Sequence, residues 1–410
     1  MVGSLGPRLI EGGIHDVQGF KANGHAAGIK RMRKDLSVIF STRPNTAAAG
    51  VYTTNKVRAA PVTVTEEHLA SGYARAIVCN AGCANAATGE QGYQDALEMA
   101  QLTAKCLNIS PDEVVVASTG VIGRHLPMDI VREGIKNCVG TLDQAEPGSV
   151  ARAMMTTDLV PKEVLVEAEI NGVVVRFAGV AKGSGMIHPN MATMLGWVVT
   201  DAAVEPDALR TALRDVVNRT FNMISVDGDT STNDMCVVLA NGAAGNQPVT
   251  RQRGYQQLKD ALYLVCETLA KKIARDGEGA TTLLEVRIEN ARSPADARKA
   301  ARSVTKSPLV KSAVFGRDPN WGRILAAVGY SGAEFEPSKV DIQMKSAAGA
   351  AWVLKAGEPC ETLDSAGLRR IVDKDHVIFV VDLHDGEHDA VAWGCDLTYD
   401  YVKINADYTT

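Results

Sequence analysis

A threonine that follows a glycine-rich loop is the residue of this sequence best placed to do chemistry. The loop, residues 182–190, holds two glycines, a proline and several polar side chains, and it leads through Ala192-Thr193 into an apolar run that ends at Thr200. A threonine exposed at the start of a strand can attack the carbonyl carbon of the residue before it, and a residue as small as Ala192 leaves room for that attack. Hydrolysis of the resulting ester would leave a new chain that begins with Thr193.

Such a cleavage would give Thr193 its own catalytic base. A free α-amine has an ordinary pKa of about 7.7–8.0, so it can take the proton of a neighbouring hydroxyl near neutral pH. A threonine hydroxyl with its own N-terminal amine is one of the recognised nucleophile–base pairs of acyl transfer. The alternative is that Thr193 is one β-branched residue of a strand, where such residues are common. Spacing alone leaves both interpretations open.

Acyl transfer also requires donors for the oxyanion of the tetrahedral intermediate. The apolar run 113–117 predicts a short strand that stops at Ser118-Thr119-Gly120. At such a strand end the Gly120 N–H and the Thr119 hydroxyl could both point outward, and losing one such donor raises the barrier by about 2.7–4 kcal/mol. An ordinary strand-end turn is the alternative at this stage.

The elements that must position these residues are short strands alternating with helices. Apolar and β-branched runs predict strands at residues 37–40, 48–53, 62–64, 76–79 and 235–240. Apolar residues at helical spacing predict helices at residues 93–107, 205–221 and 255–274. Between two further apolar runs, 163–170 and 173–177, Asn171-Gly172 favours a type I′ hairpin turn.

A smaller α/β unit is expected after about residue 285. Ser293-Pro294 is typical of a helix start. Apolar runs predict four more strands, at residues 309–315, 339–344, 377–383 and 390–397. We therefore expect two domains, 1–284 and 285–410.

Composition excludes several classes of function. The 410 residues are 46% hydrophobic and 22% charged, which is an ordinary globular mixture. The net charge of -5 gives no basic footprint for nucleic acid. No apolar run has the roughly 18 residues that cross a membrane, and residues 1–14 do not read as a signal peptide, so we expect a cytoplasmic protein. The eight cysteines include no Cys-x-x-Cys pair, which argues against a structural metal or a disulfide framework.

Five runs of residues are spread over nearly the whole chain: KGSGMIHPNMATML at 182–195, GFKANG with GIK at 19–24 and 28–30, STGVIG at 118–123, DGDTSTND at 227–234 and GRDPNWGR at 316–323. Together they resemble the ornithine acetyltransferase family, whose members are glutamate N-acetyltransferases of arginine biosynthesis. The resemblance implies an α/β fold related to the N-terminal-nucleophile amidases, an αββα sandwich with a smaller C-terminal α/β domain. It also implies cleavage between Ala192 and Thr193 into an α chain, 1–192, and a β chain, 193–410, assembling as α2β2.

The resemblance assigns roles to individual residues. The nucleophile falls on Thr193, and the oxyanion pair falls on Thr119 and Gly120. Substrate contacts fall on Thr156, Lys182, Thr193, Glu278, Asn405 and Thr410. Because Thr157 is adjacent to Thr156, the resemblance leaves undecided which of the two threonines is the substrate contact. Asn405 and Thr410 lie in a terminal segment, so their role requires the segment to be held over the active site.

The expected reaction follows from these roles. The acetyl group of N²-acetylornithine would pass to Thr193, ornithine would leave, and glutamate would take the acetyl group to give N-acetylglutamate, in a ping-pong sequence. No cofactor or metal is expected, and use of acetyl-CoA as a further acetyl donor stays open. One departure from the family pattern is Cys83, which stands where a polar Asn is expected.

Other functions remain as alternatives. An N-terminal-nucleophile aminopeptidase or amidase of the same fold would differ only in its acceptor, water instead of glutamate. A metal-binding protein could use His384, Asp385, Glu387 and His388, although these residues resemble a charged hairpin turn. A binding module that had kept the fold would leave the chain uncleaved.

Overall fold

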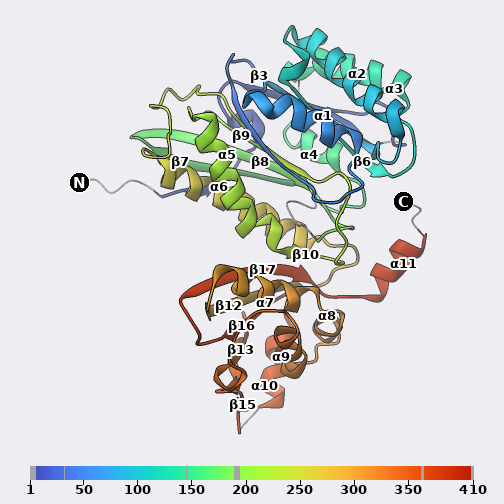
Figure 1. Cartoon of the computed structure of the whole chain (residues 1–410). Coiled ribbons are helices and arrows are strands. Elements are labelled where there is room, and N and C mark those ends of the chain that lie inside the picture. The colour runs from blue at the N-terminus through green and yellow to red at the C-terminus, as the bar shows by residue number, and fades with distance from the viewer. Residues whose placement is uncertain (1–5, 32, 145, 189–193, 362–363, 408–410) are drawn as a thin grey trace.

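The computed structural model of the chain describes residues 6–31, 33–144, 146–188, 194–361 and 364–407. Its strands form three sheets, two of them stacked and the third below them in the view of Figure 1. The first sheet has the order β1 (Arg8–Ile10), β7 (Lys162–Ile170), β8 (Val173–Lys182), β9 (Leu195–Thr200), β11 (Met235–Ala240) and β4 (Ala47–Tyr52). The second has the order β2 (Phe20–His25), β3 (Leu36–Ser41), β5 (Ala76–Cys83) and β6 (Val114–Val121).

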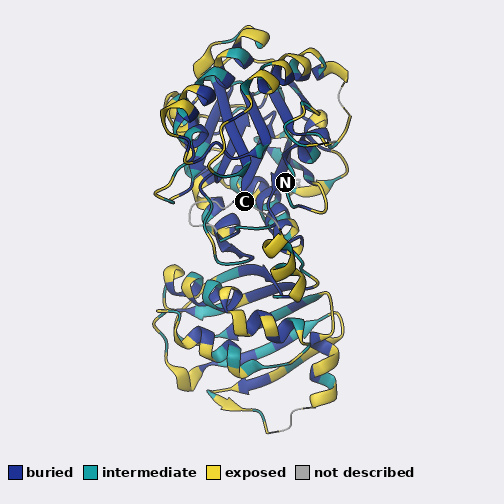
Figure 2. Cartoon of the chain, turned by 90° about the vertical axis from the view of Figure 1, so that its right-hand side faces the viewer, coloured by how far each residue is buried: buried dark blue, intermediate teal, exposed yellow. Residues whose placement is uncertain are grey.

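The two stacked sheets bury a common core between them. Along β9, Trp197 and Val199 face the second sheet, whereas Val198 between them faces the helices on the other side. This alternation is the two-residue period of a strand, and because both faces of β9 are covered, all its residues are buried. Figure 2 shows the buried strands as the dark blue centre of the upper part of the molecule.

Helices cover both outer faces of this sandwich. Against the second sheet pack α1 (Ala60–His68), α2 (Gly89–Leu107) and α3 (Met128–Gly140). Against the first sheet pack α5 (Pro206–Arg219) and α6 (Tyr255–Arg275). The short helix α4 (Ser149–Met154) contacts strands of both sheets. The layers confirm the expected αββα sandwich, with α6 packed by the apolar side chains that predicted it.

The third sheet has seven strands, mostly from the last part of the chain. Its order is β10 (Ile224–Ser225), β17 (His388–Cys395), β12 (Leu283–Ala291), β16 (His376–Asp382), β13 (Asp341–Ser346), β14 (Gly349–Lys355) and β15 (Glu358–Pro359). The remaining helices are α7 (Pro294–Lys306), α8 (Pro308–Phe315), α9 (Trp321–Gly329), α10 (Ser365–Val372) and α11 (Tyr399–Asp407). The expected boundary at 284/285 falls inside β12, and the division into two domains stays a prediction.

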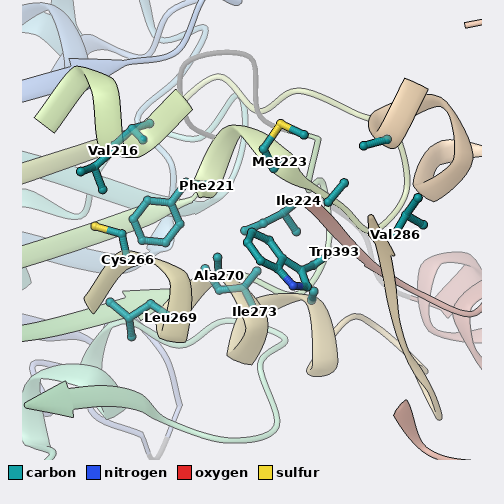
Figure 3. Close-up of a cluster of buried hydrophobic side chains, with 14 of the residues drawn as sticks. Val216, Phe221, Met223, Ile224, Cys266, Leu269, Ala270, Ile273, Val286 and Trp393 are labelled. Atoms are coloured by element: carbon teal, nitrogen blue, oxygen red, sulfur yellow. The ribbon is translucent and has the colours of Figure 1, made fainter. Parts of the chain in front are cut away.

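Apolar packing continues from α6 into the third sheet. Ile224 of β10 pairs with Trp393 of β17, and Figure 3 shows both among Phe221, Met223 and Ile273. Because β10 precedes the last part of the chain by about 60 residues of sequence, this strand ties the third sheet back to the sandwich. Among the helices that the structure describes, none is long and apolar enough to cross a membrane.

Two expected strands are helices. Residues 62–64 lie in α1, where Pro61 favours the first turn and the Thr65 hydroxyl donates to the Val116 carbonyl, 2.7 Å away. Residues 309–315 lie in α8, whose Ser307 cap accepts the Val310 N–H. In α8, Val310 and Val314 are buried on one face, whereas in α1 Val62 and Val64 are buried in two different apolar clusters. In both helices this packing overrides the strand propensity of β-branched residues. The Asn171-Gly172 turn is confirmed, with φ of 52° and 78°.

Candidate active site

A polar pocket lies where strands of the two stacked sheets end. Its wall includes the ends of β6 and β8, the segments 156–157 and 185–186, and the run 227–233. Glu278, just after α6, and side chains of α11 complete it. The pocket brings together six of the predicted site residues, Thr119, Gly120, Thr156, Lys182, Glu278 and Asn405. The other three, Ala192, Thr193 and Thr410, lie outside the described residues.

The expected oxyanion residues occupy the end of a strand rather than a turn beyond it. β6 continues past Thr119 and Gly120 to Val121, paired in parallel with β5. Gly120 has a φ of 131°, a conformation that side-chain-bearing residues avoid, and a Cβ there would lie 2.4 Å from the carbonyl carbon of Gly82. The close approach of β5 therefore requires glycine at this position, and it holds the Thr119 side chain at the pocket wall.

Replacing Gly120 with Ala is expected to disrupt this wall. The strained φ costs about 1–3 kcal/mol, the clash with Gly82 adds to it, and a displaced Gly120 N–H would lower kcat by about 10²–10³ if it serves the oxyanion. Urea unfolding and an acetyl-transfer assay measure the two effects. Gly123→Ala is the matched control, because Gly123 also has a positive φ, 77°, but open space around its Cβ position. Equal behaviour of the two variants would contradict the role of the β5 contact.

Lys182 is the basic side chain of the described pocket wall. It is only 8% exposed, and its Nζ lies 3.5 Å from the Thr119 hydroxyl oxygen. Next to it lies Asp158, a buried carboxylate. Burial opposes the ionisation of Asp158, but the charges of Lys182 and Lys162 outweigh that effect and hold its pKa well below the usual range. Asp158 is therefore a carboxylate at neutral pH.

The C-terminal helix α11 closes one side of the pocket. Asn405 donates through Nδ2 to Glu278 Oε2 at 2.7 Å. Nearer the start of α11, the Thr398 hydroxyl donates to the Gly279 carbonyl at 2.9 Å and accepts the Tyr401 N–H. Burial, and then the charges of Asp227, Asp229 and Glu278, raise the pKa of the Tyr401 hydroxyl, which keeps it protonated. These contacts place Asn405 at the site, as its assigned role requires.

The run 227–234 contributes structural residues whose roles the sequence did not reveal. Asp227 accepts the N–H groups of Met186 and Ile187 at 2.6 and 2.8 Å and so fixes the glycine-rich loop. Asn233 donates to the carbonyls of Ala84 and Ser118 at 2.6 and 2.8 Å. From the sequence this run was recognised only as a motif. The residues that Asp227 and Asn233 bind are far from them in the sequence, so no local pattern could predict these contacts.

Asp234 ends this run as a fully buried carboxyl group. Burial raises its pKa well above the usual value, against hydrogen bonds from Ser231 and from the backbone of Met194. Among the described residues its Oδ2 has no hydrogen-bond partner. Met194 follows Thr193 directly in the sequence. The Asp234 carboxyl group thus binds the backbone of the residue that follows the expected nucleophile in the sequence.

His188, in the glycine-rich loop, is held neutral. Burial first, and then the charges of Arg302 and Lys306, lower the pKa of its imidazole to about 4. Its Nδ1 lies 3.1 Å from the Ser225 hydroxyl and its Nε2 lies 2.8 Å from Arg302. The loop is therefore anchored to α7 by a neutral ring.

Two expectations outside the pocket can also be placed. Cys83 is buried at the end of β5, and its thiol donates to the Arg124 carbonyl at 3.1 Å. His384 Nε2 lies 3.1 Å from Asp341 Oδ2, within hydrogen-bonding distance. Over the described ranges, no group of three or more His, Cys, Asp or Glu side chains could hold a metal ion.

A two-sheet sandwich with helices on both outer faces, and a charged pocket at the strand ends, places the chain among the layered mixed α/β proteins. Comparison with known proteins narrows this class. The ArgJ family model matches residues 21–410, and the chain belongs to that family. This confirms the resemblance inferred from the motifs.

The relatives and solved structures carry related names. A protein of Symbiobacterium thermophilum is 54% identical over 405 residues, covering 98% of this chain and 99% of its own length. One of Clostridium acetobutylicum is 51% identical over 397 residues, covering 96% and 97%. Both are called arginine biosynthesis bifunctional proteins ArgJ. A crystal structure of the Bacillus halodurans ArgJ protein is 45% identical, with a TM-score of 0.48, over 52% of this chain and 98% of that one. An ornithine acetyltransferase of Mycobacterium tuberculosis, solved with ornithine, is 39% identical, with a TM-score of 0.42, over 45% and 100%.

Proposed function

We propose that this chain is a self-cleaving acetyltransferase that moves the acetyl group of N²-acetylornithine to glutamate through Thr193. The observation that carries the proposal is the pocket itself. Six residues that the family resemblance assigns to oxyanion stabilisation and substrate binding come from five separate places in the sequence, and they line one cavity. The names of relatives at about half identity over nearly the whole chain support the same reaction.

The first half-reaction would form an ester on Thr193. Its α-amine takes the hydroxyl proton while Oγ attacks the acetyl carbonyl, and Thr119 and Gly120 donate to the oxyanion. The intermediate collapses as the ornithine nitrogen leaves with that proton, and acetyl-Thr193 remains. The second half-reaction is the reverse with the glutamate amine as nucleophile. No cofactor takes part, and water must be kept from the ester while it exists.

The charges of the pocket suit an amino acid that carries both signs. Lys182 offers an ammonium group, and Glu278 offers a carboxylate whose Oε2 is held by Asn405. N²-acetylornithine has an α-carboxylate and a side-chain ammonium group, so each of its charges would find an opposite partner. Thr156 and Thr157 both line the wall, and the assignment to Thr156 stays a prediction.

Several further properties belong to the proposal. The mature enzyme would consist of an α chain, 1–192, and a β chain, 193–410, assembled as α2β2 in the cytoplasm. A denaturing gel should show two bands, and N-terminal sequencing of the second should begin at Thr193. An intact, active chain would overturn the proposal. Synthesis of N-acetylglutamate with acetyl-CoA as donor is tested by an acetyl-transfer assay in which acetyl-CoA replaces N²-acetylornithine.

Incubation with N²-acetylornithine and no glutamate is expected to add one acetyl group to the 193–410 chain only, because the ester can form but has no acceptor. Intact-mass spectrometry checks this, and glutamate added afterwards should remove the group and yield N-acetylglutamate. An amidase of the same fold would instead release acetate, with no acetylglutamate. Acetate as the main product would favour that alternative.

A further inference from the structure

Three buried charges form a triad behind the pocket. Lys162, whose side chain is 0% exposed, places its Nζ 2.7 Å from Asp158 Oδ1 and 2.5 Å from Asp276 Oδ2. A fully buried lysine is uncommon, and burying such ions gains little stability over well-packed apolar residues. The triad therefore calls for an explanation other than stability.

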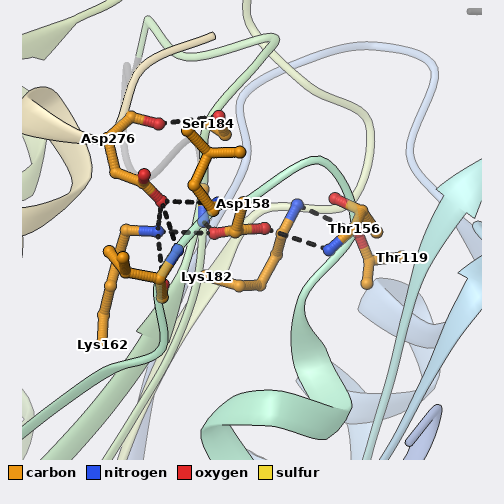
Figure 4. Close-up of polar contacts among 10 residues, drawn as sticks. Thr119, Thr156, Asp158, Lys162, Lys182, Ser184 and Asp276 are labelled. Atoms are coloured by element: carbon orange, nitrogen blue, oxygen red, sulfur yellow. Dashed lines mark hydrogen bonds and ion pairs between the residues drawn. The ribbon is translucent and has the colours of Figure 1, made fainter. Parts of the chain in front are cut away.

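Each carboxylate also accepts backbone N–H groups. Asp158 accepts the Gly183 N–H at 2.7 Å and the Thr156 N–H at 3.0 Å. Asp276 accepts the Leu159 N–H at 3.1 Å. Figure 4 shows the triad joined in this way to the segments that carry Thr156 and Lys182.

The third connection reaches Glu278. The Ser184 hydroxyl donates to the Asp276 carbonyl at 2.7 Å, and the Ser184 carbonyl accepts the Glu278 N–H at 3.2 Å. The segments 156–162, 182–184 and 276–278 are far apart in the sequence, and the triad with Ser184 joins all three. Each carries one expected substrate contact, namely Thr156, Lys182 or Glu278.

The charge of the triad also concerns Lys182. One lysine and two aspartates leave an excess of one negative charge, and Lys182 and Lys30 are further cations that interact with Asp158. The negative charge of the triad thus attracts the Lys182 ammonium group, whose Nζ lies 3.5 Å from the Thr119 hydroxyl, while the Lys182 side chain forms part of the pocket wall.

We propose that the Asp158–Lys162–Asp276 triad is the positioning element of the substrate site, and that Asp158 sets the place of Lys182. The triad touches no substrate; it acts through the three side chains whose segments it joins. This inference rests on the proposed function for its kinetic test, but its structural test does not.

Asp158→Asn is the variant of choice, because it keeps the shape of the side chain, removes its charge and removes one of its acceptors. We expect the KM for N²-acetylornithine to rise about 10- to 100-fold with kcat changed less than about threefold, because displaced binding side chains lose contacts that the ground state and the transition state share. Glu285→Gln is the matched control. Glu285 is also a buried carboxylate with charged partners, 2% exposed and bonded to Arg287, but it lies in the third sheet. It should lower stability and leave KM unchanged.

A second readout does not depend on catalysis. Limited acetylation of the full protein by acetic anhydride, followed by peptide mass spectrometry, measures the reactivity of Lys182. The reactivity should rise several-fold in Asp158→Asn and stay unchanged in Glu285→Gln. If wild-type protein transfers no acetyl group, the proposed function fails while this readout still tests the positioning.

Asp276→Asn removes the charge of the other carboxylate of the triad, and it provides a second test if Asp158→Asn does not fold. The same rise in KM and in Lys182 reactivity is expected. Folded variants with unchanged KM and unchanged Lys182 reactivity would overturn the proposal, as would a Glu285→Gln variant that shows the same changes.

Discussion

Thr193→Ala is expected to yield a single 410-residue chain with acetyl transfer reduced on the order of 10⁴-fold or more. Alanine has no hydroxyl to attack the preceding carbonyl, so the chain is not cut and no α-amine is released. The ester also has no oxygen on which to form. A denaturing gel and an acetyl-transfer assay measure the two losses.

Two further variants separate the causes. Thr193→Ser keeps the hydroxyl and should still be cut, with lower activity. Thr211→Ala, on the outer surface of α5, should behave as wild type. A Thr193→Ala protein that is cut between 192 and 193 would refute self-cleavage by this hydroxyl. If that cut protein were also inactive, the role of Thr193 in acetyl transfer would still stand.

Lys162→Met is expected to destabilise the fold by about 3–5 kcal/mol, because it leaves Asp158 and Asp276 buried without the cation between them. The midpoint of urea unfolding at neutral pH measures this. Lys136→Met is the control, since Lys136 is 55% exposed and lies 3.7 Å from Glu133; its midpoint should hardly move.

Wild type and Lys162→Met should also differ in how much stability they lose at acidic pH. The folded-state pKa of Asp158 is lowered, so its contribution to stability is fully present above the ordinary aspartate pKa of about 3.9 and is lost as the pH falls below it. Without Lys162 that contribution shrinks. Wild type should therefore lose more stability than Lys162→Met between about pH 5 and pH 2, and equal losses would contradict the ion pairing.

Local signals explain which elements the sequence predicted. Ser293-Pro294 was read as a helix start and begins α7. Ser307-Pro308 is the same signal and begins α8, but the apolar run behind it, 309–315, favoured a strand. The Ser-Pro cap predicted this helix correctly and the apolar run did not, because a short apolar run is equally compatible with a buried strand and a buried helix.

Local signals also explain which residues of the site the sequence predicted and which it did not. Lys182 and Gly120 could be named from motifs, since each lies in a run that is distinctive by itself. The triad could not, because Asp276 is more than a hundred residues from Asp158 and Lys162, and a lysine in a sequence normally indicates surface. These distant charges come together because α6, which ends just before Asp276, packs against β7, which begins at Lys162.

The order of strands in the first sheet has a consequence for the products of cleavage. β9 and β11, which follow position 193, lie between β8 and β4, which precede it, and both borders are continuous ladders of hydrogen bonds. A cut before Thr193 would thus free a chain end without freeing a fragment. The two polypeptides could be parted only by unfolding, and neither half expressed alone would complete the sheet.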